Sequence, residues 1–154
     1  VDPSAVLSIM KKEGLNADQM SDLLNKESGV KGISGVSSDI REVEAGIREG
    51  NERCKLAMEM YDYRIKKYIG SYAAVMGGVD IVVFTAGVGE HQWDVRQGAI
   101  EDLEFMGIKV DTEKNKKNFG EEEIISTPDS KVKVVIVPTD EELLIASDTL
   151  DLVK

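Results

Sequence analysis

The sequence predicts an α/β fold with a short parallel sheet set among several helices. Two runs of β-branched and apolar residues, 81–84 and 132–137, have the composition of strands buried on both faces. Each run passes through a turn into a stretch with helical periodicity, and two such units in succession predict parallel pairing. We expect one domain over residues 1–154, with 1–78 mainly helical and 79–154 forming the βαβα portion.

Composition excludes several classes of function. The 29 acidic residues exceed the 19 basic ones and give a net charge of -10, which disfavours nucleic acid or an anionic membrane as a partner. No apolar run approaches the ~20 residues that span a bilayer, so we expect a soluble, cytoplasmic protein. With Cys54 and His91 as the sole cysteine and histidine, we expect no internal disulfide and no Cys/His zinc site. Any metal is expected to be bound by oxygen.

The first half is predicted to consist of helices interrupted by one loop. Asn16 can form a capping box with Gln19 at the start of one helix. The segment 29–38 holds three glycines and three serines, so it is expected to be a loop. Ser38 is the expected N-cap of the helix that follows.

A long helix is predicted after Asn51, ending near Gly77. Residues 57, 61, 65, 68, 72 and 76 recur on one face of it. The tyrosines at this spacing fit either the core or a subunit interface better than a stacking platform for a ligand. Cys54, near its start, is expected to be a small buried side chain.

The second half switches to strands. Residues 95, 99, 103 and 106 share one face of a predicted helix that Gly107 ends, and 123–126 is expected to be a short edge strand. In parallel sheets, ligands bind beyond the carboxyl ends of the strands, so the turns after 81–84 and 132–137 should face one crevice.

These two turns carry the candidate chemistry. Gly87 and Gly89 would let backbone amides approach a phosphate or nucleoside, although glycine is common in any turn between a strand and a helix. In the second turn, Thr139 and Glu142 are expected to form a capping box, which leaves Asp140 and Glu141 freer to face a magnesium ion. Acidic residues in a first helical turn are also ordinary partners of the helix dipole.

Three segments together resemble one family. GISGVSSDIRE (32–42), VVFTAGVGEHQWDVR (82–96) and STPDSKVKVVIVPTDEELLIA (126–146) are similar, in order and separation, to the C-terminal half of acetate kinases. The intervening segment GNERCKLAMEMYDYRIKKYIGSYAAVMGGVD (50–80) is equally similar, so the resemblance covers nearly the whole chain. That family belongs to the actin, sugar kinase and Hsp70 superfamily, so the resemblance implies a partial ribonuclease H-like (actin-like ATPase) domain. It also implies transfer of the γ-phosphoryl group of ATP to acetate, giving ADP and acetyl phosphate, with Mg2+.

The resemblance assigns roles to particular residues. Asp39 would lie near the ribose and Arg41 over the base, and Glu141 matches the metal-binding glutamate of the family's T-N-E-E segment. His91 stands where the family's G-I-G-E-N turn usually has asparagine, so at this position the resemblance implies the backbone approach to the nucleotide. The residues implied to bind the nucleotide are Asp39, Ile40, Arg41, Gly87, Val88, Gly89, Glu90 and His91.

Family members are more than twice as long as this chain, and their other half holds the cations that neutralise the transferred phosphoryl group. We therefore expect no catalytic residue in this chain and no turnover by it alone. Acetate kinases are dimers, so a homodimer is expected. Two alternatives remain: a non-catalytic dimerisation module, using residues 29–37 and the tyrosine-bearing helix, and part of a related propionate or butyrate kinase.

Overall fold

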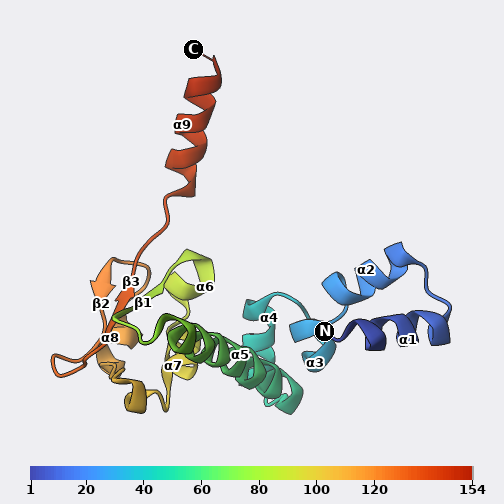
Figure 1. The fold of residues 1–154 in the computed structure, drawn as a ribbon, viewed down its shortest axis with the longest axis horizontal. Helices are drawn as coiled ribbons and strands as arrows, with labels where there is room; N and C mark the ends of the chain where they lie inside the picture. Colours follow the sequence, from blue (N-terminus) through green and yellow to red (C-terminus); the bar gives the residue numbers. More distant parts are fainter. Residues whose placement is uncertain (154) are drawn as a thin grey trace. The chain divides into compact units, whose positions relative to one another are not determined.

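The computed structural model describes residues 1–153, and they form two compact units (Figure 1). The first is Val1–Tyr61 and the second is Asp62–Lys154, so the division falls within the long helix α5 (Glu52–Met76). This helix confirms the prediction made from its periodicity.

The first unit is helical, as expected. Its helices are α1 (Pro3–Glu13), α2 (Ala17–Lys26), α3 (Gly29–Ser34), α4 (Ile40–Arg48) and the first part of α5. The capping box predicted at the start of α2 is confirmed, because Asn16 Oδ1 accepts from the Gln19 amide and Gln19 Oε1 accepts from the Asn16 amide, both at 2.9 Å.

Helix α3 lies where a loop was expected. Gly35, in the left-handed conformation with φ of 72°, ends it. The Arg53 guanidinium donates to the carbonyl oxygens of Ile33, at 2.8 Å, and Gly32, at 3.1 Å. These carbonyls lie in the last turn of the helix, where no partner within the helix is available. A distant arginine therefore stabilises a helix that the local glycine content argued against.

Helix α4 begins one residue later than expected, because Asp39 and not Ser38 is its N-cap. Asp39 Oδ1 accepts from the Arg41 amide at 2.9 Å. Helices α4 and α5 approach closely at Gly46, where a Cβ atom would lie 2.6 Å from the Cys54 sulfur. Cys54 is buried and free, as predicted.

The second unit contains a three-stranded sheet of order β1-β3-β2 (Figure 1). Strands β1 (Ile81–Phe84) and β3 (Lys133–Ile136) pair in parallel, with Ile81 opposite Lys133 and Phe84 opposite Ile136. The short strand β2 (Glu123–Ile124) adds an antiparallel edge. The parallel pair and the edge strand were both predicted.

The core of this unit lies on one face of the sheet. Phe84, Val134 and Ile136 are buried there together with residues of α7 (Trp93–Ile100), and Ile65 and Ile69 of α5 pack against the cluster. Ile81 and Val83 on the other face of β1 are 52% and 51% exposed. The expectation that this strand is covered on both faces is therefore wrong for this chain.

Three further helical segments differ from the expectation. The glycine turn is itself a short helix, α6 (Ala86–His91). The helix predicted to reach Gly107 stops at Ile100, because Glu101 leaves the helical conformation with a ψ of 142°. Asp102 follows with a φ of 62°, and then comes the 3-10 helix η1 (Glu104–Met106). Helix α8 (Thr112–Lys117), capped by Asp111, was not predicted. Helix α9 (Glu141–Val153) was predicted, and none of its residues is buried.

Among the described residues, no helix combines the length and the apolar character needed to cross a membrane.

Candidate functional site

The two glycines of α6 have different environments. A Cβ atom on Gly89 would lie 3.2 Å from the carbonyl carbon of Phe84, so the absence of a side chain lets α6 pack against the end of β1. A Cβ atom on Gly87 would meet no atom within 4 Å. Ala86, between the strand and these glycines, has a φ of 59°, which is a strained conformation for alanine. Gly89 thus serves the packing of the turn, whereas Gly87 presents open backbone.

Arg96 fixes this turn from inside the protein. Its side chain is fully buried. Nη1 donates to the carbonyl oxygens of Gly89, at 2.9 Å, and Glu90, at 2.7 Å. The rest of the guanidinium donates to Asn115 Oδ1 at 2.7 Å, Asn115 O at 2.9 Å and Asn118 O at 3.1 Å. Burial lowers the pKa of Arg96 from its usual range. The arginine therefore joins α6 to the C-terminal end of α8.

Glu90 links the two turns that the sequence placed at the strand ends. Its Oε1 accepts from the Thr139 amide and from the Thr139 hydroxyl, each at 2.9 Å. The hydrogen bond from the Thr139 amide, followed by that from its hydroxyl, holds the pKa of the Glu90 carboxyl below its usual range. The structure thus brings the turns after β1 and β3 into contact, as expected from the parallel sheet. The Glu90 carboxylate is engaged by protein groups.

The start of α9 differs from the predicted capping box. Thr139 bonds to Glu90, and Asp140 caps the helix instead, its Oδ1 accepting from the Leu143 amide at 3.0 Å. Asp140 is therefore less free for a metal than expected, whereas Glu141 is exposed in the first helical turn. No group of three or more His, Cys, Asp or Glu residues among those described could hold a metal ion. A single free carboxylate still fits Mg2+, which in nucleotide sites takes one or two carboxylates, water and phosphate oxygens.

His91 packs on the loop that follows α8. Its ring centroid lies 5.2 Å from that of Phe119. A Cβ atom on Gly120 would lie 2.5 Å from His91 Cε1, and Gly120 has a φ of 93°. Glycine at position 120 therefore makes room for the His91 imidazole.

Asp39, Ile40 and Arg41 lie in the first unit, at the start of α4. Arg41 Nη2 donates to Asp39 Oδ2 at 2.6 Å and Nε donates to Asp39 Oδ1 at 3.0 Å. The Arg41 guanidinium lowers the pKa of Asp39, and Asp39 raises that of Arg41. The Arg41 side chain is exposed. The pair presents an ordered, planar cation of the kind that stacks on aromatic bases.

The sequence analysis assigned no role to Arg96 and Asn115, which hold α6 against α8, or to the bond from the Thr139 hydroxyl to Glu90. One signal was present: Arg96 lies between Val95 and the buried Ala99 and Ile100 on a short helix, where an exposed arginine is not expected.

Comparison with known proteins identifies the family. Residues 1–147 match the model of the acetokinase family. The acetate kinase of Bacteroides thetaiotaomicron is 64% identical over 154 residues, which are 100% of this chain and 39% of that protein. The crystal structure of Porphyromonas gingivalis acetate kinase superposes with a TM-score of 0.91 at 58% identity, over 100% of this chain and 39% of that one. A propionate kinase from Francisella tularensis gives a TM-score of 0.83 at 34% identity, over 95% of this chain and 37% of that one.

The chain is therefore an α/β protein of the acetokinase family, as its motifs predicted. It spans about two fifths of the length of the curated relatives that it matches.

Proposed function

We propose that this chain is the nucleotide-binding part of an acetate kinase, which transfers the γ-phosphoryl group of ATP reversibly to acetate. The observation that carries this proposal is the match to the acetokinase family over residues 1–147. We take acetate as the acceptor because the relatives that are 64% and 58% identical are acetate kinases, and a longer carboxylate stays the alternative. A cytoplasmic location and the absence of a nucleic-acid partner stay predictions.

In this proposal, the open backbone at Gly87 approaches the nucleotide, followed by Val88. Arg41 of the first unit, ordered by Asp39, contacts the base. Glu141 is the protein ligand of Mg2+, which when bound neutralises charge on the nucleotide phosphates. Gly89 supports the turn by packing against the end of β1, and the Glu90 carboxylate bonds to Thr139. For Ile40 and His91, the proposed contact with the nucleotide rests on the family resemblance alone.

Phosphoryl transfer depends on cations that neutralise the transferred group. Glu141 and Gly87, the residues proposed to lie near the metal and the phosphates, carry no positive charge. We therefore expect this chain alone to bind Mg·ADP weakly and to form no acetyl phosphate. Turnover should appear when the remaining three fifths of an acetate kinase is supplied.

The test is a titration with Mg·ADP followed by the fluorescence of Trp93, which begins α7 two residues after α6 ends. Gly87→Val fills the open space at the turn with little cost to folding, so it should abolish a saturable signal. Gly70→Val is the matched control, since a Cβ atom there also meets nothing within 4 Å. Equal binding by wild type and Gly87→Val would refute the nucleotide role of the turn. Gly89→Val is unsuitable because it would collide with the β1 backbone.

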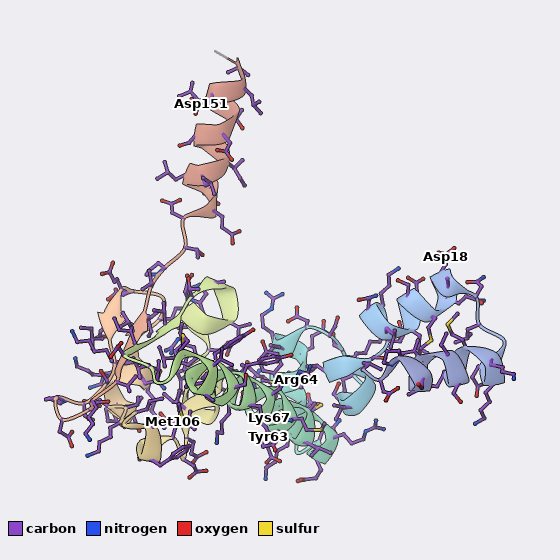
Figure 2. All side chains as sticks on the ribbon, in the orientation of Figure 1. Asp18, Tyr63, Arg64, Lys67, Met106 and Asp151 are labelled. Carbon is purple, nitrogen blue, oxygen red and sulfur yellow. The ribbon has the colours of Figure 1, made fainter. Side chains whose placement is uncertain are left out.

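A second candidate function is self-association, which one observation favours. The tyrosine surface of α5, defined as residues 63, 64, 67, 68, 71 and 72, is exposed. Figure 2 labels Tyr63, Arg64 and Lys67 on this helix. Tyr63 and Tyr72 are 62% and 61% exposed, so these rings do not belong to a core in this chain. Arg64 and Lys67 lie over the rings of Tyr68 and Tyr63. Tyrosine and arginine are enriched in subunit interfaces, which supports a homodimer formed through this surface.

A further inference from the structure

We propose that Glu90 is a positioning residue that anchors the metal-binding end of α9 to the nucleotide turn, through Thr139. This inference rests on the proposed function, because it concerns how Glu141 is held for Mg2+. It gives Glu90 a role different from the direct nucleotide contact implied by the family resemblance.

The anchor is short and buried on the Glu90 side. Glu90 is 7% exposed, and one carboxylate oxygen accepts two hydrogen bonds of 2.9 Å from Thr139, 49 residues further along the chain. The Glu90 backbone is itself held, since Arg96 Nη1 donates to its carbonyl oxygen at 2.7 Å. The carboxylate therefore projects from a fixed part of the second unit.

Thr139 and the start of α9 make few other contacts with the rest of the second unit among the described residues. The parallel ladder continues to Val137, whose amide donates to the Phe84 carbonyl at 2.9 Å. Beyond Thr139, the hydrogen bonds of α9 among the described residues are made within the helix, as from the Leu143 amide to Asp140. No residue of α9 is buried. The two bonds to Glu90 thus set the position of the chain two residues before Glu141.

Loss of this anchor should affect metal and nucleotide differently. Glu141 is the only metal ligand in the proposal, and it would sample more positions if Thr139 were released. Removing a group that orients a metal ligand typically costs about 10-fold to 100-fold in metal affinity. The backbone at Gly87 lies on the fixed side of the anchor, so binding of nucleotide without metal should be unaffected.

The experiment measures the dissociation constant of ADP with Mg2+ and with EDTA, and calls for four variants. Thr139→Val removes the hydroxyl and keeps the amide, and Glu90→Ala removes the acceptor of both bonds. Thr139→Ser and Glu90→Gln each keep a group able to make the contact. Thr149→Val is the matched control, since its hydroxyl bonds only to the Ile145 carbonyl within α9 among the described residues.

We expect Mg2+ to tighten ADP binding in the wild type, Thr139→Ser and Thr149→Val. In Glu90→Ala, the factor by which Mg2+ tightens ADP binding should fall by about tenfold, and in Thr139→Val it should fall by less. In both variants, the dissociation constant of ADP in EDTA should change by less than about twofold. Glu90→Gln should recover most of the gain. In the absence of nucleotide, amide hydrogen exchange at 139–143 should accelerate in Glu90→Ala and not in Thr149→Val.

The outcomes separate the two proposals. A wild-type chain that binds ADP, with Glu90→Ala retaining the full gain from Mg2+, would overturn the anchor and leave the proposed function intact. A parallel loss of affinity with and without Mg2+ would also overturn it, because that is the result of general damage to the turn. A folded wild-type chain that binds no nucleotide would overturn the proposed function, and the anchor's role with it.

Discussion

At the scale of single residues, Asp62 on α5 is a carboxylate in an unfavourable environment. Its Oδ1 is buried and has no hydrogen-bond partner among the described residues. Burial first, then the negative charge of Asp94, raises the pKa of Asp62 to about 7, against the opposing effect of Lys66. Gly98 of α7 leaves the space that this carboxyl group occupies.

The raised pKa predicts how stability depends on pH. Since the folded pKa lies above the unfolded value of 3.8, the protonated carboxyl stabilises the folded state fully below about pH 4. That contribution is lost as pH rises toward 7. A shift of this size corresponds to about 4 kcal/mol, and partial solvent access reduces the expected loss to about 2 kcal/mol. Asp62→Asn should remove this dependence and be the more stable protein at pH 8.

Urea denaturation of wild type and Asp62→Asn at pH 5 and pH 8 measures the effect. Asp148→Asn, on α9, is the control, because it should follow the wild type at both values. The prediction fails when wild type and Asp62→Asn lose stability equally between pH 5 and pH 8.

At the scale of elements, α6, α7 and α8 are held together by one buried side chain. Each of these helices has eight residues or fewer, so none would be stable alone. Arg96, on α7, satisfies carbonyl groups at the ends of the other two. A cation at the C-terminal ends of helices is also favoured by their dipoles. The arrangement of the nucleotide turn therefore depends on a contact across more than 20 residues of sequence.

Arg96→Met should destabilise the second unit by more than about 3 kcal/mol, because it leaves several buried carbonyl oxygens without a donor. Arg96→Lys should recover part of this loss, since one ammonium group cannot reach all five acceptors. Chemical denaturation measures both. Arg64→Met on exposed α5 is the control, with an expected change within about 0.5 kcal/mol. A change of that size for Arg96→Met would contradict the structural role of Arg96.

At the scale of the whole molecule, the exposed tyrosine surface of α5 predicts self-association. A pocket of about 280 Å³ lies among Arg64, Lys67, Tyr68 and Ser71 of this surface. Tyr68 and Tyr72 stack with ring centroids 6.1 Å apart, and together they offer a continuous aromatic surface to a partner. The net charge of -10 opposes association, and the local arginine and lysine reduce that repulsion here.

We expect the weight-average mass in sedimentation equilibrium to rise with concentration and Tyr72→Glu to shift the dissociation constant upward by about tenfold or more. Val36→Glu is the control, because residues 29–37 are the other segment that the sequence analysis proposed for a subunit interface. Val30 and Ile33 in that segment are partly buried, whereas Val36 is exposed. Unchanged association in Tyr72→Glu and weakened association in Val36→Glu would move the interface to that segment.

The sequence by itself determined the elements whose signals are local. The helical periodicity of α5, the capping box of α2, the two apolar runs that became β1 and β3, and the family's motifs could all be read along the chain. Each of these signals is read from the order and spacing of residues along the chain, so it does not depend on which residues meet in the folded protein.

Tertiary structure decided the features that depend on partners far along the chain. Arg53 stabilises α3 from 20 residues away. Thr139 bonds to Glu90 instead of forming the capping box that was predicted with Glu142. The buried environment of Arg96 and the raised pKa of Asp62 likewise depend on which elements pack together. A hydrogen bond or a desolvation cost of a kcal/mol or more outweighs the few tenths of a kcal/mol that distinguish local preferences, and only folding brings those groups into contact.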